Sequence, residues 1–235
     1  MLRPLFSYYG SKWRIAKRYP APEHQTIVEP FAGAAGYSLR HHQHDVILIE
    51  INPIVAGVWS YLTSARESEI LRLPLLEPFE TVDDKQWPCN EAKDLVGFWL
   101  NRGTVAPRKR HTAMAVRHWD RKPGSRWGEQ SRARVARQVS MINHWRVICG
   151  SYKDAPDVAA TWFVDPPYQQ AGKHYPHGSH AIDYDDLASY CRDRQGLAIV
   201  CENTGATWLP FGHLCAAKAM RKGRPSQEAV WVQRA

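Results

Sequence analysis

The sequence predicts an α/β fold in which helices cover both faces of a mostly parallel sheet. Short runs of β-branched and aromatic residues recur along the 235-residue chain, and stretches with apolar residues at helical spacing separate them. Several runs end in a glycine loop, a proline pair or an acidic residue, as is typical of the carboxyl ends of parallel strands. Hydrophobic residues make up 44% of the chain, which is enough for the core of a single domain.

The run Thr161–Val164 predicts a buried strand, and the turn after it is the main candidate for chemistry. Pro166 and Pro167 have no backbone N–H, so strand pairing must end there, and Asp165 and Tyr168 are left at the edge of the sheet. Such a stiff turn suits a flat base with an exocyclic amino group. Asp165 and the Pro166 carbonyl would accept the amino hydrogens while Tyr168 stacks on the ring. The alternative is a strand that ends in a proline turn with a capping aspartate.

Two earlier segments predict a ligand site at the same edge of the sheet. Residues 8–12, YYGSK, form a tight turn before a predicted helix from Trp13, and a helix N-terminus beside Lys12 attracts a carboxylate or phosphate. Residues 25–36, QTIVEPFAGAAG, predict a strand and a small-residue loop, with a helix near residues 37–39. The glycines of that loop let a nucleotide-like ligand approach the backbone.

The next predicted strand, residues 45–50, ends in an acidic residue. Glu50 lies 17 positions beyond Gly33, and an acid at a strand end about 20 residues after a glycine loop is placed to bind ribose hydroxyls. Further predicted elements are strands at 146–149, 197–201 and 229–232, the last as an antiparallel edge, and a helix at 184–195.

The Asp-Pro-Pro-Tyr sequence at 165–168 resembles the catalytic motif of the Dam-like family of DNA adenine-N6 methyltransferases. Residues 8–12 resemble the family's N-terminal cofactor motif, residues 31–36 its glycine loop and residues 50–52 its acidic-x-Asn segment. The resemblance covers the cofactor and catalytic parts of the chain. It implies a Rossmann-like class I methyltransferase sheet and S-adenosylmethionine as the cofactor. The implied catalytic residues are Asp165, Pro166, Pro167 and Tyr168. The implied cofactor contacts are Tyr8, Gly10, Lys12, Phe31, Ala32, Gly33, Glu50, Asn52 and Asp165, with Gly150, Ser151 and Tyr152 as further candidates.

The chain departs from the family pattern at three positions. Ser11 stands where the N-terminal motif usually has a second glycine, and Glu50 stands where the acid is usually aspartate. Ala35 occupies the usual place of the loop's second glycine, and Gly36 follows one position later. This last departure bears most directly on cofactor affinity.

Positive charge is concentrated in residues 101–150. This segment has 12 Lys and Arg residues against 2 acidic residues, whereas the rest of the chain has 19 against 21. Such a concentration is typical of a surface that contacts nucleic acid, although a solvated basic surface or one that faces acidic lipid has the same charge. We interpret residues 55–145 as a helical, loop-rich insertion with a basic target-recognition region at about 102–145.

Two tryptophans, Trp119 and Trp127, interleave with this charge and suit base stacking or wedging. Residues 131–145 predict an amphipathic helix whose apolar face carries Val135, Val139, Ile142 and Trp145. The expected partner is double-stranded DNA. The candidate DNA-binding residues are Arg108, Lys109, Arg110, Arg121, Lys122, Arg126 and Arg132.

Neither of the two groups of histidines in the sequence is interpreted as a metal site. Residues 169–182 contain His174, His177 and His180, but Pro176 and Gly178 argue against the helix that would align them, so we expect a mobile loop that closes over substrate. His41, His42 and His44 are expected at the polar end of a helix. Glu202, Asn203 and Thr204 follow a predicted strand on the ligand side, where they bind ligand or form a turn.

The remaining composition predicts a monomeric cytoplasmic protein. No apolar run approaches the roughly 18 residues that span a membrane, and residues 1–6 lead too early to tyrosines and a glycine for a signal peptide. The five cysteines form no C-x-x-C pair, which favours reduced thiols over disulfides or zinc.

The resemblance and the basic segment together predict methyl transfer from S-adenosylmethionine to the N6 amino group of a flipped-out adenine in DNA. Three alternatives remain open at this point. In the first, the methyl acceptor is N4 of cytosine. In the second, it is an amine of RNA or protein. In the third, the chain binds cofactor and DNA without catalysis.

Overall fold

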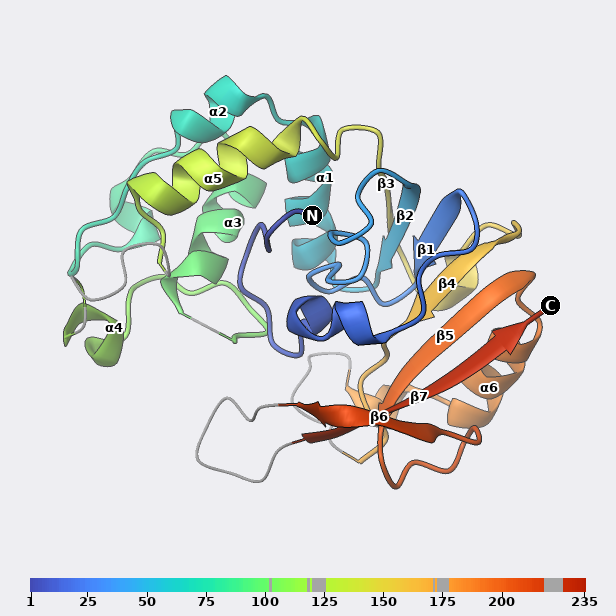
Figure 1. Cartoon of the computed structure of the whole chain (residues 1–235). Coiled ribbons are helices and arrows are strands. Elements are labelled where there is room, and N and C mark those ends of the chain that lie inside the picture. Colours follow the sequence, from blue (N-terminus) through green and yellow to red (C-terminus); the bar gives the residue numbers. More distant parts are fainter. Residues whose placement is uncertain (102, 118, 120–125, 171, 173–177, 218–225) are drawn as a thin grey trace.

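The computed structural model describes residues 1–235 apart from 102, 118, 120–125, 171, 173–177 and 218–225. Its centre is a seven-stranded sheet with the order β3-β2-β1-β4-β5-β7-β6 (Figure 1). The strands are β1 (Thr26–Glu29), β2 (Asp45–Glu50), β3 (Arg146–Cys149), β4 (Ala160–Val164), β5 (Gly196–Asn203), β6 (Gly212–Ala217) and β7 (Ser226–Arg234).

The strands β1 to β5 are paired in parallel, and β7 is antiparallel to both β5 and β6. From β1 the chain proceeds outward through β2 to β3, whereas from β4 it proceeds in the opposite direction through β5. The order therefore reverses between β1 and β4, and open α/β sheets bind their ligands outside the carboxyl ends of strands at such a point. The prediction of an α/β fold with a mostly parallel sheet is confirmed.

One prediction about the C-terminal strand is wrong. The run 229–232 is antiparallel as expected, but it lies inside the sheet between β5 and β6 instead of at its edge. The edge strand β6 was not predicted, because its sequence, GHLCAA, has neither a clear alternation of polar and apolar residues nor enrichment in β-branched residues.

Alternate residues of the central strands enter two different core clusters. On β4, Phe163 belongs to the first cluster, while Trp162 and Val164 belong to the second. Helix α1 (Pro53–Ser64) contributes to the first cluster and helix α6 (Tyr184–Arg192) to the second. Because strand side chains alternate between faces, the two clusters lie on opposite faces, and helices cover both as predicted.

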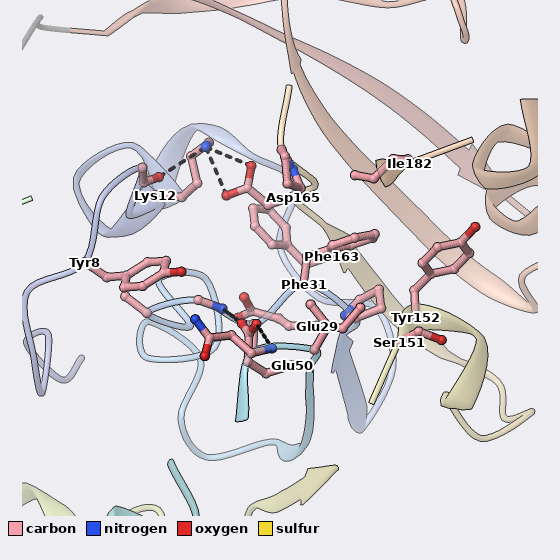
Figure 2. Close-up of a pocket in the computed structure, with 18 of the residues that line it drawn as sticks. Tyr8, Lys12, Glu29, Phe31, Glu50, Ser151, Tyr152, Phe163, Asp165 and Ile182 are labelled. Atoms are coloured by element: carbon pink, nitrogen blue, oxygen red, sulfur yellow. Dashed lines mark hydrogen bonds and ion pairs between the residues drawn. The ribbon is translucent and has the colours of Figure 1, made fainter. Parts of the chain in front are cut away.

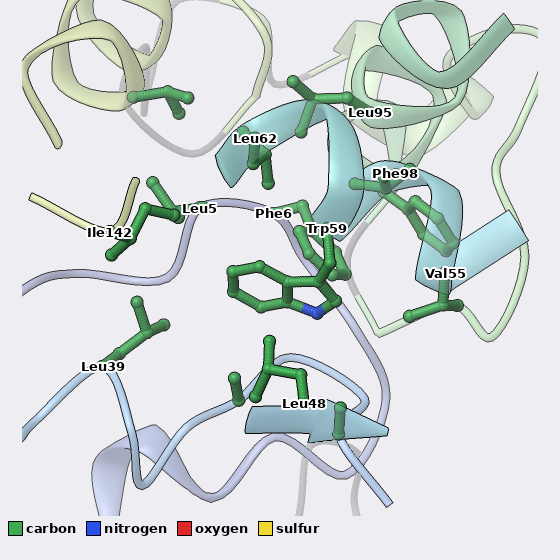
Figure 3. Packing of buried hydrophobic residues seen from close by; sticks show 14 of the residues in the cluster. Leu5, Phe6, Leu39, Leu48, Val55, Trp59, Leu62, Leu95, Phe98 and Ile142 are labelled. Carbon is green, nitrogen blue, oxygen red and sulfur yellow. The ribbon is translucent and has the colours of Figure 1, made fainter. Parts of the chain in front are cut away.

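Among the described residues, the segment between β2 and β3 has four further α-helices, namely α2 (Glu67–Leu71), α3 (Asn90–Leu100), α4 (Ala113–Arg117) and α5 (Glu129–Val139). Helix α1 contacts β2 and β3, α3 and α5 contact α1, and α2 contacts α5 (Figure 1). Trp59 lies at the centre of this packing, between Leu48 of β2 and Phe98 of α3 (Figure 3). Its indole N–H donates to the Gly33 carbonyl at 2.7 Å, so the helical core also fixes the glycine loop.

The helix predicted from Trp13 is wrong. The chain instead forms two 3-10 turns, Lys12–Arg14 and Ala16–Arg18. Tyr19 is extended because it precedes Pro20, so the segment is too short to form a stable α-helix.

The helix predicted near residues 37–39 is also wrong, since these residues form a series of turns. Ser38 N–H donates to Glu29 Oε1 at 2.7 Å instead of to a helical carbonyl. Ala35 has a φ of 46°, a left-handed conformation that cannot continue a right-handed helix.

The helix predicted at 131–145 is shorter than expected, because α5 ends at Val139. Met141 N–H and Ile142 N–H bond to carbonyls three residues earlier, so the chain tightens into turns. All four residues of the predicted apolar face are nevertheless buried. Among the described residues, the helices are too short or too polar for one of them to span a bilayer.

Candidate active site

A cavity of about 380 Å³ lies at the reversal point, outside the carboxyl ends of β1, β2 and β4 (Figure 2). Small-molecule sites in proteins have volumes of this order. All of the residues predicted to contact a cofactor line this cavity, namely Tyr8, Gly10, Lys12, Phe31, Ala32, Gly33, Glu50, Asn52 and Asp165. Ser151, Tyr152 and Pro167 line it as well. Three further candidates, Gly150, Pro166 and Tyr168, are not among the described residues of its wall.

Glu50 holds the two backbone segments at one end of the cavity. Its Oε2 accepts Gly33 N–H and its Oε1 accepts Asn52 N–H, both at 2.9 Å, and the residue is only 7% exposed. Asn52 in turn caps α1 by accepting Ile54 N–H at 3.0 Å. Glu50 also lines the cavity, and carboxyl oxygens are acceptors for ligand hydroxyls.

Two aromatic rings that stack on one another line another part of the cavity. Phe31 and Tyr152 stack with ring centroids 5.5 Å apart and an interplanar angle of 26°. The Tyr152 hydroxyl donates to Asp186 of α6, which fixes that ring. Ile182 also lines this end, and Figure 2 shows it beside the two rings. An apolar wall of this kind suits a planar heteroaromatic ring.

The glycine loop packs directly on the N-terminal turn. A Cβ atom on Gly36 would lie 2.5 Å from the backbone nitrogen of Trp13, so this position tolerates no side chain. Ala35 adopts its left-handed conformation with its methyl group buried. The shift of the second glycine from 35 to 36 therefore has a structural reason, because close backbone approach occurs at Gly36.

Lys12 and Asp165 form an ion pair at the other end of the cavity. Lys12 Nζ lies 2.8 Å from Asp165 Oδ1 and 3.0 Å from Oδ2, and it also donates to the Gly10 carbonyl at 3.2 Å. The two side chains are 8% and 18% exposed. Burial raises the pKa of the Asp165 carboxyl, and the neighbouring ammonium opposes that shift. The N-terminal turn thus stabilises the charged form of the carboxylate that the sequence marks as catalytic.

Other side chains anchor the backbone of the proline turn. Tyr184 Oη donates to the Pro167 carbonyl at 2.5 Å, and Gln169 N–H donates to Glu202 Oε2 at 2.9 Å. Glu202 is buried and also accepts Trp208 Nε1–H at 3.1 Å. Glu202 therefore has a structural contact at the end of β5, and sequence reasoning assigned no role to Tyr184 or Trp208.

Glu29, at the end of β1, is a buried carboxyl in the cavity wall that the sequence analysis did not single out. Burial raises its pKa from 4.5 to about 8, although the hydrogen bond from Ser38 opposes that shift. The folded protein therefore binds a proton here that the unfolded chain releases near pH 4.5.

We expect Glu29 to lower the free energy of unfolding as the pH rises from about 4.5 to about 8. The expected decrease is a few kcal/mol, since one pKa unit corresponds to about 1.4 kcal/mol. Glu29→Gln keeps an amide oxygen for Ser38 and removes the titrating carboxyl. The profile of its free energy of unfolding against pH should therefore be flatter than that of wild type. Urea unfolding of both proteins at pH 5 and pH 8 measures the difference, and parallel profiles would contradict this assignment.

The basic segment is attached to the N-terminal turn of the site. Gly103 N–H donates to Ser7 Oγ at 3.1 Å, and Tyr9 N–H donates to the Thr104 carbonyl at 3.1 Å. The residues that follow include exposed Arg108, Lys109 and Arg110. Lys109 Nζ forms a surface ion pair with Asp83 at 2.9 Å, so it offers less positive charge than its neighbours.

The other predicted DNA contacts differ in their surroundings. The Arg126 guanidinium lies 3.7 Å from the ring centroid of Trp119, and Arg132 donates to the Leu73 carbonyl at 2.8 Å. Trp127 is fully buried and its indole N–H donates to the Pro74 carbonyl, so the interpretation of this ring as a base-stacking group is wrong. Arg121 and Lys122 lie outside the described residues.

Of the histidines that the sequence singles out, His174 and His177 lie outside the described residues. Within the described part of the chain, no three His, Cys, Asp or Glu side chains are grouped so that they could hold a metal ion. His41, His42 and His44 belong to the turns before β2, with a ring nitrogen of His44 3.1 Å from the His24 carbonyl.

A scan of the chain against protein-family models gives no match, and a search of curated proteins gives none either.

Proposed function

We propose that this protein transfers a methyl group from S-adenosylmethionine to the N6 amino group of adenine in DNA. The observation that carries the proposal is the single cavity wall that joins Glu50, the Phe31–Tyr152 pair and Asp165. The two ends of the cavity differ in chemistry. The Glu50 end would bind the nucleoside part of the cofactor, and the Asp165 end, called the acceptor end below, would bind the amino group of the base. A mostly parallel sheet with an antiparallel strand beside β5 is compatible with the class I methyltransferase sheet that the resemblance implies.

The donor groups in the cavity fit S-adenosylmethionine. Glu50 would accept from the ribose hydroxyls, and the wall of Phe31 and Tyr152 would contact the adenine ring. Tyr8 and Lys12 would contact the methionine part near the proline turn. When bound, the cofactor supplies an electrophilic methyl group on a positively charged sulfur.

Asp165 would act on the acceptor nitrogen. The N6 lone pair of adenine is delocalised into the ring, so the amine is a poor nucleophile. Hydrogen bonds from the amino group to Asp165 and the Pro166 carbonyl favour a pyramidal nitrogen and stabilise the positive charge that develops on it. The new N–C bond forms as the S–C bond breaks, the electron pair of the broken bond stays on sulfur, and the nitrogen loses one proton to solvent. The rate would come from positioning and electrostatics.

The basic segment supports DNA as the substrate. It is hydrogen-bonded at Gly103 and Thr104 to the segment that holds Lys12, and exposed Arg108, Lys109 and Arg110 follow a few residues later. An adenine inside a duplex cannot reach Asp165, so it must flip out, and the Tyr168 ring would stack on it. Phosphate contacts from Arg108 and Arg110 would hold the duplex while the base is extruded.

Replacing Arg108, Lys109 and Arg110 by alanine is expected to weaken DNA binding and to reduce its salt dependence. Each lost phosphate contact lowers the slope of log K against log salt by about 1, so we expect a decrease of about 2 to 3. The lower figure applies if the Asp83 ion pair already neutralises Lys109. Fluorescence anisotropy with duplex DNA at several salt concentrations measures the slope.

The control for that experiment removes three exposed basic side chains elsewhere, by substitution of Lys17, Arg66 and Arg192 with alanine. If both triple variants lower the slope equally, the DNA surface does not centre on residues 108–110.

The proposal as a whole is tested with cofactor that carries a labelled methyl group. Calorimetry first establishes whether the protein binds S-adenosylmethionine, and incubation with unmethylated duplex DNA then shows whether label enters the DNA. We expect both. Cofactor binding without transfer to DNA would contradict the proposed reaction, and transfer to RNA or protein in place of DNA would change the acceptor.

A further inference from the structure

A buried carboxylate from β7 contacts the tyrosine of the proline turn. Tyr168 Oη donates to Glu228 Oε2 at 2.5 Å, although 60 positions separate the two residues in the sequence. Glu228 is 5% exposed and is paired in register with Asn203 at the end of β5. Because β7 is antiparallel, its first residues lie at the carboxyl ends of the parallel strands. This strand therefore brings an acidic side chain to the tyrosine of the proline turn, next to Asp165 and outside the set of residues that line the cavity.

The bond has a fixed direction. Burial raises the pKa of the Tyr168 phenol well above its ordinary value, and the nearby Asp165 and Glu228 carboxylates raise it further. The phenol is therefore a protonated donor at neutral pH.

A second polar contact fixes the same ring. Lys12 Nζ lies 4.7 Å from the centroid of the Tyr168 ring while it is bound to Asp165. Glu228 holds the hydroxyl end of the ring, and Lys12 lies over its face. The plane of Tyr168 is thus set relative to Asp165, the group that would bind the amino nitrogen.

We infer that Glu228 is a positioning residue for the acceptor base. It holds the hydroxyl of Tyr168 and so fixes the plane on which the base stacks, which aligns the amino nitrogen with Asp165. Glu228 itself does not touch the substrate. The inference rests on the proposed function, because it concerns the base that Tyr168 would stack on. A misplacement of about 1 Å in such a site is enough to reduce the rate of group transfer strongly.

A positioning role differs from a purely structural one in the kinetic constants that it changes. Loss of the correct ring plane affects the DNA acceptor and leaves the Glu50 end of the cavity intact. It should therefore lower kcat and raise the KM for DNA, with little change in the KM for S-adenosylmethionine. A loss of folded protein would lower kcat alone and leave both KM values unchanged.

The test compares kcat and both KM values of the full chain with those of four variants, namely Tyr168→Phe, Glu228→Gln, Glu228→Leu and the double variant Tyr168→Phe/Glu228→Leu. We expect Tyr168→Phe and Glu228→Leu each to lower kcat/KM for DNA about tenfold. The double variant should lose clearly less than the product of the two single losses, since both single variants remove the Tyr168–Glu228 bond. Glu228→Gln should recover most of the activity, because its amide oxygen still accepts from the phenol. Tyr61→Phe, on α1, makes the same chemical change at a residue that does not line the cavity, and its kinetic constants should match those of wild type.

The outcomes distinguish this inference from the proposed function. If wild-type protein transfers no methyl group to DNA, the proposed function itself fails. If wild type is active and the two single losses add in the double variant, or if both KM values stay unchanged, Glu228 is not a positioning residue. Should Glu228→Leu not fold, Tyr168→Phe with a normal KM for DNA would overturn the inference by itself.

Discussion

Asp165→Ala is expected to reduce the proposed methyl transfer to DNA about 10²–10³-fold or more, because it removes the acceptor that would stabilise charge on the reacting nitrogen. The carboxylate lies in the cavity wall, and Lys12 favours its ionised form. The cofactor dissociation constant should change far less, since Glu50 and the aromatic wall remain. Label transfer under single-turnover conditions measures the chemical step directly.

Removal of Asp165 also leaves the Lys12 ammonium buried without its carboxylate, which destabilises a protein by about 3–5 kcal/mol. The double variant Asp165→Ala/Lys12→Met removes both charges and serves as the control for folding. If Asp165→Ala is folded by circular dichroism and turns over at the wild-type rate, Asp165 is not catalytic. Asp165→Asn retains one acceptor oxygen, so we expect an intermediate rate.

Glu50→Ala is expected to raise the dissociation constant of S-adenosylmethionine about 10–100-fold. Both carboxylate oxygens hold backbone N–H groups, at Gly33 and Asn52, and they would also accept from the ribose. The substitution therefore removes ligand contacts and also releases the glycine loop. Isothermal titration calorimetry on the purified protein measures the change.

Two further variants make the Glu50 experiment specific. Glu50→Gln keeps one acceptor and should bind with intermediate affinity. Glu69→Ala changes a half-buried glutamate on α2 that does not line the cavity, and it should bind as wild type does. Wild-type affinity of Glu50→Ala in a folded protein would show that the cofactor lies elsewhere.

The strands of this fold could be predicted because their signal is local. The runs that became β1 to β5 are short and rich in β-branched and aromatic residues, and each ends at a glycine, a proline or an acid. The helix that was wrongly predicted near residues 37–39 and the strand that was missed, β6, both depend on tertiary contacts. Ser38 donates to Glu29 and leaves no helix after the glycine loop, and β6 is a strand because it pairs with β7.

The site shows the same division. Lys12 and Asp165 are each marked by a motif, but their ion pair joins positions 153 residues apart, and only the fold brings them together. Glu228 and Tyr184 have no motif at all, and their contacts with the proline turn follow from the packing of β7 and α6. Trp127 was misinterpreted because its basic neighbours suggested an exposed ring. Its position just before a helix with an apolar face was the signal for a buried one.

The central claim is that Asp165 directs methyl transfer to an adenine amino group. The most direct test is mass spectrometry of nucleosides from unmethylated DNA that has been incubated with the purified protein and S-adenosylmethionine. We expect N6-methyladenine with wild-type protein and none with folded Asp165→Ala. N4-methylcytosine would keep the chemistry and change the base. A protein that binds cofactor and DNA but leaves every nucleoside unmethylated would contradict the account.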